Sequence, residues 1–209
     1  MRPQVLSKGP TLIRPFLLAL SLAAATAMPA AAQQQSESYK FLQAIEKEDG
    51  KTVTTMIETP GSTIINTKSP TTGRGALHDL TSHSGSLYMQ YLLQHKADPN
   101  IRDSKGNTPL ALAVMAGRDD LVDLLLTFKA NPNLANASGQ TPLILAVNTR
   151  NEGIARTLLN KGGDPDQRDN LAGLSARDYA LRDSRNPVMV ALFKDAPKKV
   201  RAQVSGPKL

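Results

Sequence analysis

Gly106-Asn-Thr-Pro-Leu110 recurs 33 residues later as Gly139-Gln-Thr-Pro-Leu143. Thr108 and Thr141 are suited to cap a helix, because a threonine hydroxyl accepts a hydrogen bond from a backbone N–H of the first turn. The proline after each threonine favours the first helical position, where its missing N–H costs nothing. The repeated stretch therefore predicts that one helix begins after Thr108 and another after Thr141.

The same period of 33 residues appears in independent landmarks along the chain. They are Pro99, Pro132 and Pro165, each inside an Asp/Asn-Pro-Asn/Asp turn, and the leucine pairs at 92–93, 125–126 and 158–159. Weaker copies of the repeated stretch occur at 73–78 and 173–180, and the apolar residues from Phe41 to Ile57 fit one more pair of helices. A fixed period in several landmarks indicates a stacked repeat protein, so we expect about five units with the first and last as caps.

Each unit is predicted to contain two helices. Leu110, Ala113 and Val114 have the i, i+3, i+4 spacing of one helical face, and Gly117 permits the chain to reverse. A second helix is predicted from Asp119, because carboxylates favour the positive end of a helix. Its apolar side chains are expected to be buried against neighbouring units: Leu121, Val122, Leu124 and Leu125.

These residues resemble the ankyrin repeat family, whose unit reads Gly-x-Thr-Pro-Leu-His-x-Ala, a glycine turn, a Leu-Leu helix and Ala-Asp-x-Asn. The unit that starts at Gly106 matches in register at Gly106, Thr108, Pro109, Leu110, Ala113, Gly117, Leu124, Leu125, Ala130, Asn131 and Asn133. The resemblance covers residues 38–193. It implies an all-α solenoid of stacked helix-turn-helix units with projecting hairpin loops.

Four positions depart from the family's pattern. Gly75-Ala76 replaces Thr-Pro, so the second unit has a weak helix cap, and we expect it to be the least stable unit. Lys96 and Lys129 stand at helix ends where the family usually has glycine, a mismatch of about 1 kcal/mol if the left-handed conformation is kept. Arg150 stands at the reversal that Gly117 makes.

Charge and composition exclude several classes of function. The net charge is +7 over 209 residues, but residues 1–32 carry three of these charges and residues 194–209 carry four. The body is therefore neutral, which is unfavourable for nucleic-acid binding because that affinity comes from many phosphate-neutralising side chains. The absence of cysteine excludes disulfides, thiolate nucleophiles and thiolate zinc sites.

Residues 1–32 have the three parts of a secretory signal peptide. Basic residues precede a 13-residue apolar stretch, Phe16–Met28, and Ala30-Ala31-Ala32 provides a cleavage site that leaves Gln33 at the amino terminus. The apolar stretch is shorter than the roughly 20 residues of a spanning helix, so a permanent anchor is the weaker alternative. We expect residues 33–37 to be a short linker and residues 194–209 a basic flexible tail; contact of this tail with anionic surfaces is the alternative.

No catalytic group, metal site or cofactor is predicted. His78, Asp79 and Ser82 make the best catalytic case, but i, i+4 spacing arises in any helix, and the resemblance gives His78 a structural role. The Asp/Asn turns each offer two or three side-chain oxygens, whereas calcium takes six to eight ligands. No glycine loop ends in the Lys-Ser/Thr of a phosphate-binding loop. We expect a protein that is not an enzyme.

The resemblance implies that the loop tips and the exposed side of the first helix of each unit bind a partner protein. These positions are Thr72, Arg74, Ser104, Lys105, Asn107, Met115, Arg118, Ser138, Gln140, Asn148 and Arg150. Taken one at a time, each also fits a purely solubilising role. The leading hypothesis is a monomeric, non-enzymatic interaction module of the bacterial periplasm. The alternative is a secreted effector that binds a host protein with the same surface.

Overall fold

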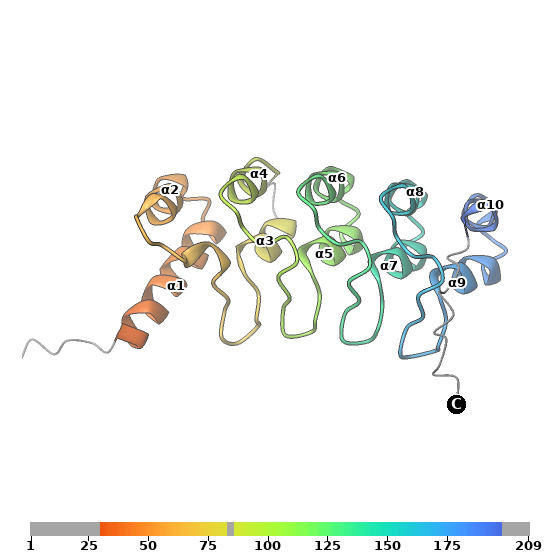
Figure 1. Cartoon of the computed structure of the whole chain (residues 1–209), viewed down its shortest axis with the longest axis horizontal. Helices are drawn as coiled ribbons and strands as arrows, with labels where there is room; N and C mark the ends of the chain where they lie inside the picture. Colours follow the sequence, from red (N-terminus) through yellow and green to blue (C-terminus); the bar gives the residue numbers. More distant parts are fainter. Residues whose placement is uncertain (1–29, 83–85, 198–209) are drawn as a thin grey trace, which may run out of the picture.

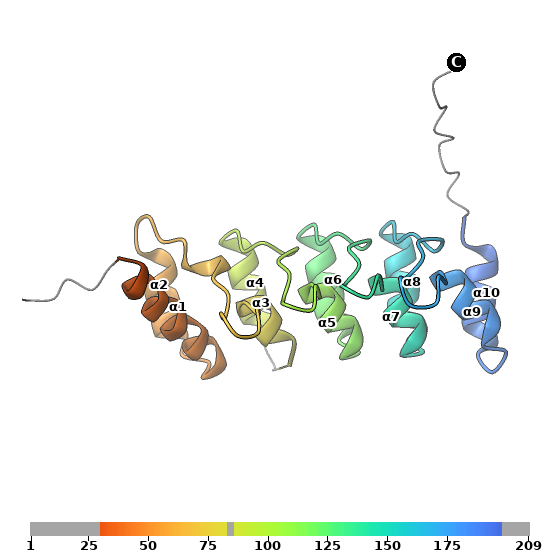
Figure 2. The same ribbon diagram turned by 90° about the horizontal axis from the view of Figure 1, so that it is seen from below.

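The computed structural model describes residues 30–82 and 86–197, which form five helix pairs in two rows (Figure 1). The inner row consists of α1 (Ala30–Glu46), α3 (Ala76–Asp79) with the 3₁₀ turn η2 (Leu80–Ser82), α5 (Pro109–Met115), α7 (Pro142–Asn148) and α9 (Ala176–Arg182). The outer row consists of α2 (Gly50–Glu58), α4 (Ser86–Gln94), α6 (Asp119–Thr127), α8 (Glu152–Asn160) and α10 (Pro187–Asp195). A view from below shows the pairs following one another in a single file (Figure 2).

This arrangement is the predicted all-α solenoid. Hairpin loops project from the inner row below the helices (Figure 1), and the 3₁₀ turn η1 (Ile64–Asn66) leads into the first of them. In the described part of the chain, β pairing is limited to one isolated bridge between Arg168 and Ser175. We name the hairpins by residues 67–75, 100–108, 133–141 and 166–175.

The helix starts follow from their caps as predicted. The Thr108 hydroxyl accepts a hydrogen bond from the Ala111 N–H at 3.2 Å, and Thr141 does the same for Ile144 at 3.2 Å. In each case the proline after the threonine is the first helical residue. The fifth unit uses Ser175 in the same role. A hydroxyl cap is therefore present at the inner helices of units three to five.

The second unit lacks such a cap, and its inner helix is short. Gly75 offers no side-chain hydrogen bond, and α3 has four residues before the chain tightens into η2. Each of α5, α7 and α9 has seven residues. The weak start is as predicted, while the order of stability among the units stays a prediction.

The core is a continuous apolar layer between the two rows. Leu110 of α5, Leu125 of α6 and Leu158 of α8 are each completely buried. Leu125 is therefore a core residue, as predicted. The prediction for Leu124 was wrong: this side chain is only half-buried, and Leu126 is buried in the core.

The two ends differ from the predicted boundaries. The helix α1 has 17 residues and includes residues 33–37, which the sequence suggested as a linker. At the other end α10 continues to Asp195, so the predicted tail begins inside this helix. Residues 1–29 and 198–209, which hold most of the predicted signal peptide and of the tail, lie outside the described residues. Cleavage after Ala32 stays a prediction.

The left-handed turns are present despite their side chains. Lys96 and Lys129 have φ angles of 67° and 68°, and Arg150 has a φ angle of 56° at the turn where Gly117 has 66°. Lys96 and Lys129 therefore keep the left-handed conformation on which their expected mismatch depends, and Arg150 adopts it as well; a Cβ atom makes this region unfavourable.

Candidate functional site

The hairpins form one surface because each is hydrogen-bonded to the next through its backbone. The backbone N–H groups of Ser104, Ala137 and Asn170 donate to the backbone carbonyl groups of Thr72, Lys105 and Ser138 respectively, each at 3.0 Å. Backbone bonds of this kind hold the tips at fixed spacing. A partner that meets the tips therefore contacts side chains whose backbones are already ordered.

A second ladder uses three asparagines, Asn66 at the end of η1 and Asn100 and Asn133 in the Pro-Asn turns. The side-chain oxygens of Asn66, Asn100 and Asn133 accept hydrogen bonds from the backbone N–H groups of Asp98, Asn131 and Asp164, at 2.8, 2.8 and 2.7 Å respectively. Sequence reasoning assigned these turns to chain reversal alone. The recurrence of asparagine after the proline, at Asn100 and Asn133, was the signal for this second role, since an amide oxygen reaches across to the following unit. Asn66 follows Ile65 and had no such signal.

The last unit has no neighbour to receive such a bond, and an ion pair replaces it. Asp166, which follows the last turn proline, binds the Arg177 guanidinium at 2.7 Å. Arg177 is only 9% exposed and also donates to the carbonyl groups of Phe193 and Ala196 at the end of α10. The buried arginine therefore closes the open end of the stack.

The predicted binding residues are mostly accessible. Six are exposed: Thr72, Ser104, Lys105, Met115, Asn148 and Arg150. Four are half-buried: Arg74, Arg118, Ser138 and Gln140. Arg74 pairs with Asp79 at 2.8 Å, and Arg118 pairs with Asp120 at 2.8 Å, so these two guanidiniums are partly engaged within the chain.

The prediction that Asn107 lies on the surface was wrong, because this residue is 8% exposed. Its backbone N–H donates to Asp103 at 2.8 Å, and its side-chain oxygen accepts from Asn136 at 3.2 Å. Its backbone carbonyl is bonded to His78 at 3.0 Å. Asn107 thus joins three successive units and is part of the scaffold.

The structure also shows a row of exposed side chains that sequence reasoning found only in part. Every inner element ends in an exposed residue, and we call these five the inner-helix row: Glu46, Ser82, Met115, Asn148 and Arg182. Met115 and Asn148 were predicted. Glu46 was missed because its unit has no repeated stretch, and Arg182 because the fifth unit is offset by 34 residues instead of 33. The row changes from acidic to apolar to basic along the solenoid.

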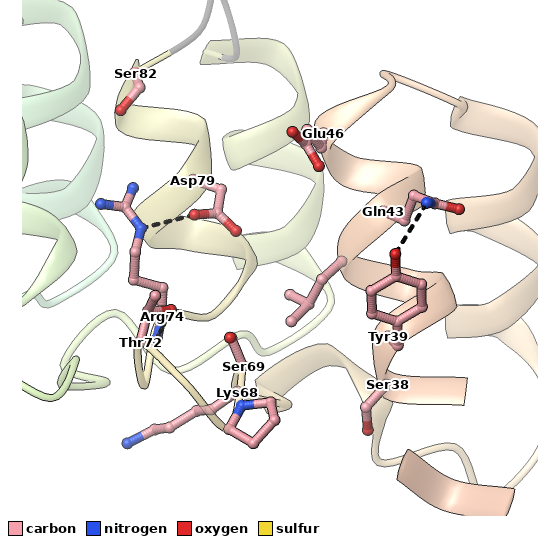
Figure 3. Close-up of a pocket in the computed structure, with 12 residues that line it drawn as sticks. Ser38, Tyr39, Gln43, Glu46, Lys68, Ser69, Thr72, Arg74, Asp79 and Ser82 are labelled. Atoms are coloured by element: carbon pink, nitrogen blue, oxygen red, sulfur yellow. Dashed lines mark hydrogen bonds and ion pairs between the residues drawn. The ribbon is translucent and has the colours of Figure 1, made fainter. Parts of the chain in front are cut away.

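A cleft lies at the amino-terminal end of this row, between α1 and the first hairpin (Figure 3). Tyr39, Leu42 and Gln43 of α1 form one wall, and Lys68 and Pro70 lie on the other; the volume is about 500 Å³. The Tyr39 hydroxyl and the Gln43 amide are 3.4 Å apart. Because α1 is longer than the other inner helices, this cleft has a helical wall where later units have a hairpin.

A second cavity of about 530 Å³ lies at the turns of the fourth and fifth units. Its lining residues are Val147, Asn148, Thr149, Arg150, Tyr179, Arg182, Asp183, Ser184 and Arg185. Arg150 belongs to the turn between α7 and α8, Arg182 is the last residue of α9, and the residues from Asp183 to Arg185 belong to the turn between α9 and α10. Arg182, the basic end of the inner-helix row, therefore lines the same cavity as Arg150 and Arg185.

Comparison with known families agrees with this architecture. The family model described as ankyrin repeats (3 copies) matches residues 28–136, 77–169 and 120–202. The chain belongs to the ankyrin repeat family. No curated protein matches the sequence at a significant level. Ankyrin repeats are in general non-enzymatic scaffolds, and membership of this family indicates a protein–protein interaction module.

His78, at the histidine position of the ankyrin unit, is structural. The Gly75 N–H donates to its Nδ1 atom at 3.1 Å, so the proton lies on Nε2, which donates to the Asn107 carbonyl at 3.0 Å. Burial lowers the pKa of His78, and this effect exceeds that of the hydrogen bond to Asn107, which acts to raise it. With both ring nitrogens engaged by the backbone, His78 is not placed to act as a base for Ser82.

Across residues 30–82 and 86–197 there is no group of three or more histidine, aspartate or glutamate side chains arranged to hold a metal ion. No helix in the same ranges is long and apolar enough to cross a membrane.

Proposed function

We propose that this ankyrin repeat protein is exported to the bacterial periplasm and there binds a partner protein through the inner-helix row and the hairpin tips. The binding proposal rests on one observation: the hairpin backbones are bonded within the stack, while the side chains proposed for binding are exposed. The hairpin backbones are bonded to one another, whereas Lys105, Met115 and Asn148 point into solvent from this rigid frame. Such an arrangement supports recognition at little cost in ordering, which is the general advantage of a preorganised surface.

Met115 is the central contact in this proposal. It is 52% exposed at the end of α5, in the middle of the inner-helix row. An exposed, polarizable methionine adapts to an apolar partner surface, and methionine and arginine are enriched at interfaces. Binding energy concentrates in a few central residues, so the loss of the Met115 side chain together with those of Lys105 and Asn148 should lower the affinity for the partner strongly.

The export proposal is supported by the composition of residues 1–32. Intact-mass measurement on the protein recovered from a periplasmic fraction should give a chain that begins at Gln33. Full-length protein recovered from the membrane fraction would instead favour an anchor, and recovery from the culture medium would favour the effector alternative.

The binding proposal is tested with a triple variant, Lys105→Ala, Met115→Ala and Asn148→Ala. A matched control on the outer row is Lys161→Ala, Val188→Ala and Asn160→Ala. It removes the same kinds of exposed side chain from the residue after α8, from α10 and from the end of α8. Both should melt close to the unmodified protein, because exposed substitutions change stability little. Partner capture from periplasmic extract should be lost only in the inner-row variant. Equal capture by both variants would refute the proposed surface.

A further inference from the structure

The cavity between the fourth and fifth units has an unbalanced charge. Among its lining residues, three arginines, Arg150, Arg182 and Arg185, accompany one carboxylate, that of Asp183. These arginines come from two turns and one helix end, so three separate backbone positions direct guanidinium groups to one place. The cavity belongs to the same face as Asn148, which both lines it and forms part of the inner-helix row.

Asp183 orients two of the guanidinium groups. Arg150 contacts the Asp183 Oδ2 atom through Nη2 at 3.0 Å and through Nε at 3.1 Å. Arg185 contacts Oδ1 through Nε at 3.3 Å. One carboxylate neutralises a single positive charge, so the group keeps a net charge of +2. The side chains of Arg150 and Arg185 are 53% and 80% exposed, which leaves further N–H donors accessible.

The backbone of Arg150 adds an independent observation. Its φ angle of 56° is left-handed, and Gly117 holds the same turn position in the preceding unit with 66°. Glycine is the residue that adopts this conformation without strain. Glu48, Lys96 and Lys129 are left-handed as well, so the φ angle alone does not mark a site; at Arg150 the strained turn places a guanidinium in the cavity.

We propose that this cavity binds an acidic segment of the partner protein, with aspartate or glutamate carboxylates accepting hydrogen bonds from Arg150, Arg182 and Arg185. The inference rests on the proposed function, because it names the chemistry of one part of that surface. Guanidinium groups recognise carboxylates through paired, charge-assisted hydrogen bonds.

The test uses the full chain and a fluorescent oligoglutamate peptide as the probe. The variant Arg150→Gly with Arg182→Gln removes two positive charges from the cavity. The glycine also relieves the left-handed turn, so thermal unfolding should occur at the same temperature or higher. Peptide affinity should fall about tenfold or more, as expected when charge-assisted hydrogen bonds are lost. It should also weaken with added salt.

The control variant carries Arg156→Gln on the outer helix α8 and Lys161→Gln at the residue after this helix, which removes the same charge from exposed positions outside the cavity. Equal loss of peptide affinity in both variants would show attraction by overall charge and overturn the site. Displacement of the peptide by an equal concentration of inorganic phosphate would overturn the assignment to a peptide segment. If partner capture survives in the cavity variant but is lost in the Lys105, Met115 and Asn148 variant, this inference fails while the proposed function stands.

Discussion

Replacing Gly106 by alanine tests whether the close approach of neighbouring hairpins stabilises the stack, and Gly173 provides a matched control. Both glycines have left-handed backbones, with φ angles of 76° and 65°. A Cβ atom on Gly106 would lie 2.8 Å from the Ala137 backbone nitrogen, whereas one on Gly173 would have no neighbour within 4 Å. The difference arises because Gly173 belongs to the last hairpin.

The magnitude follows from two contributions. The left-handed conformation costs an alanine about 1–2 kcal/mol at either position. At Gly106 the added methyl group also forces the next hairpin outward, which breaks the Ala137 to Lys105 backbone bond of 3.0 Å. A hydrogen bond of this kind contributes about 0.5–1.5 kcal/mol. Alanine reduces the entropy of the unfolded chain equally in both variants, so this effect cancels in the comparison. Gly106→Ala should therefore be the more destabilising by about 1 kcal/mol.

The assay is urea unfolding followed by far-ultraviolet circular dichroism, with both variants beside the unmodified protein. Gly173→Ala should lower the midpoint modestly and Gly106→Ala further. Equal free energies of unfolding for the two variants would refute the argument that hairpin contact contributes to stability. An unchanged midpoint for Gly173→Ala would refute the argument from the left-handed backbone.

Three further outcomes are expected. Leu125→Ala should cost about 2–5 kcal/mol in urea unfolding, because Leu125 is fully buried; an unchanged midpoint would contradict its place in the core. Burial lowers the pKa of His78 in the folded protein below its ordinary value of 6.5, so the unfolded chain binds this proton first and stability should fall as the pH drops below about 6.5. His78→Gln should remove this part of the pH dependence of Tm. An identical pH profile for the variant and the unmodified protein would contradict this prediction. The Arg102 guanidinium donates to the Ala135 carbonyl of the following hairpin at 2.8 Å. An arginine at position 135 should make the same contact with the next hairpin, so Ala135→Arg should raise the free energy of unfolding by about 0.5 kcal/mol. Ala135→Gln should leave the free energy of unfolding unchanged.

Sequence reasoning predicted the features that depend on neighbours within one unit. The Thr108 cap, the buried Leu125 and the left-handed Arg150 all follow from residue type and local spacing. Asn107 could not be placed in this way, because its burial depends on His78 and Asn136, each 29 residues distant along the chain. A hairpin residue has no helical periodicity to show which way its side chain points.

Other misses had a signal in the sequence. Arg177 occupies the position that Leu110 and Leu143 hold in earlier units once the 34-residue offset of the fifth unit is applied. A charged residue in a core position of the last unit indicates a capping role, because only an end unit has no neighbour to bury that side chain. The extent of α1 was missed for a different reason: it was interpreted through the predicted cleavage site instead of through helix propensity.

The bonding between units separates the residues that hold the stack from the residues that can differ between units. The stack repeats three kinds of position along the chain with nearly the same geometry. They are the exposed ends of the inner elements, the turn asparagines and the bonded hairpin backbones. Positions that hold the stack keep one residue type, as Asn66, Asn100 and Asn133 do, because each makes the same bond to the next unit. Positions in the inner-helix row are exposed and make no such bond along the stack, so they vary freely from Glu46 through Met115 to Arg182. The scaffold is repeated and the exposed row is not, so under the proposed function the order of charge and apolarity along this row selects the partner protein.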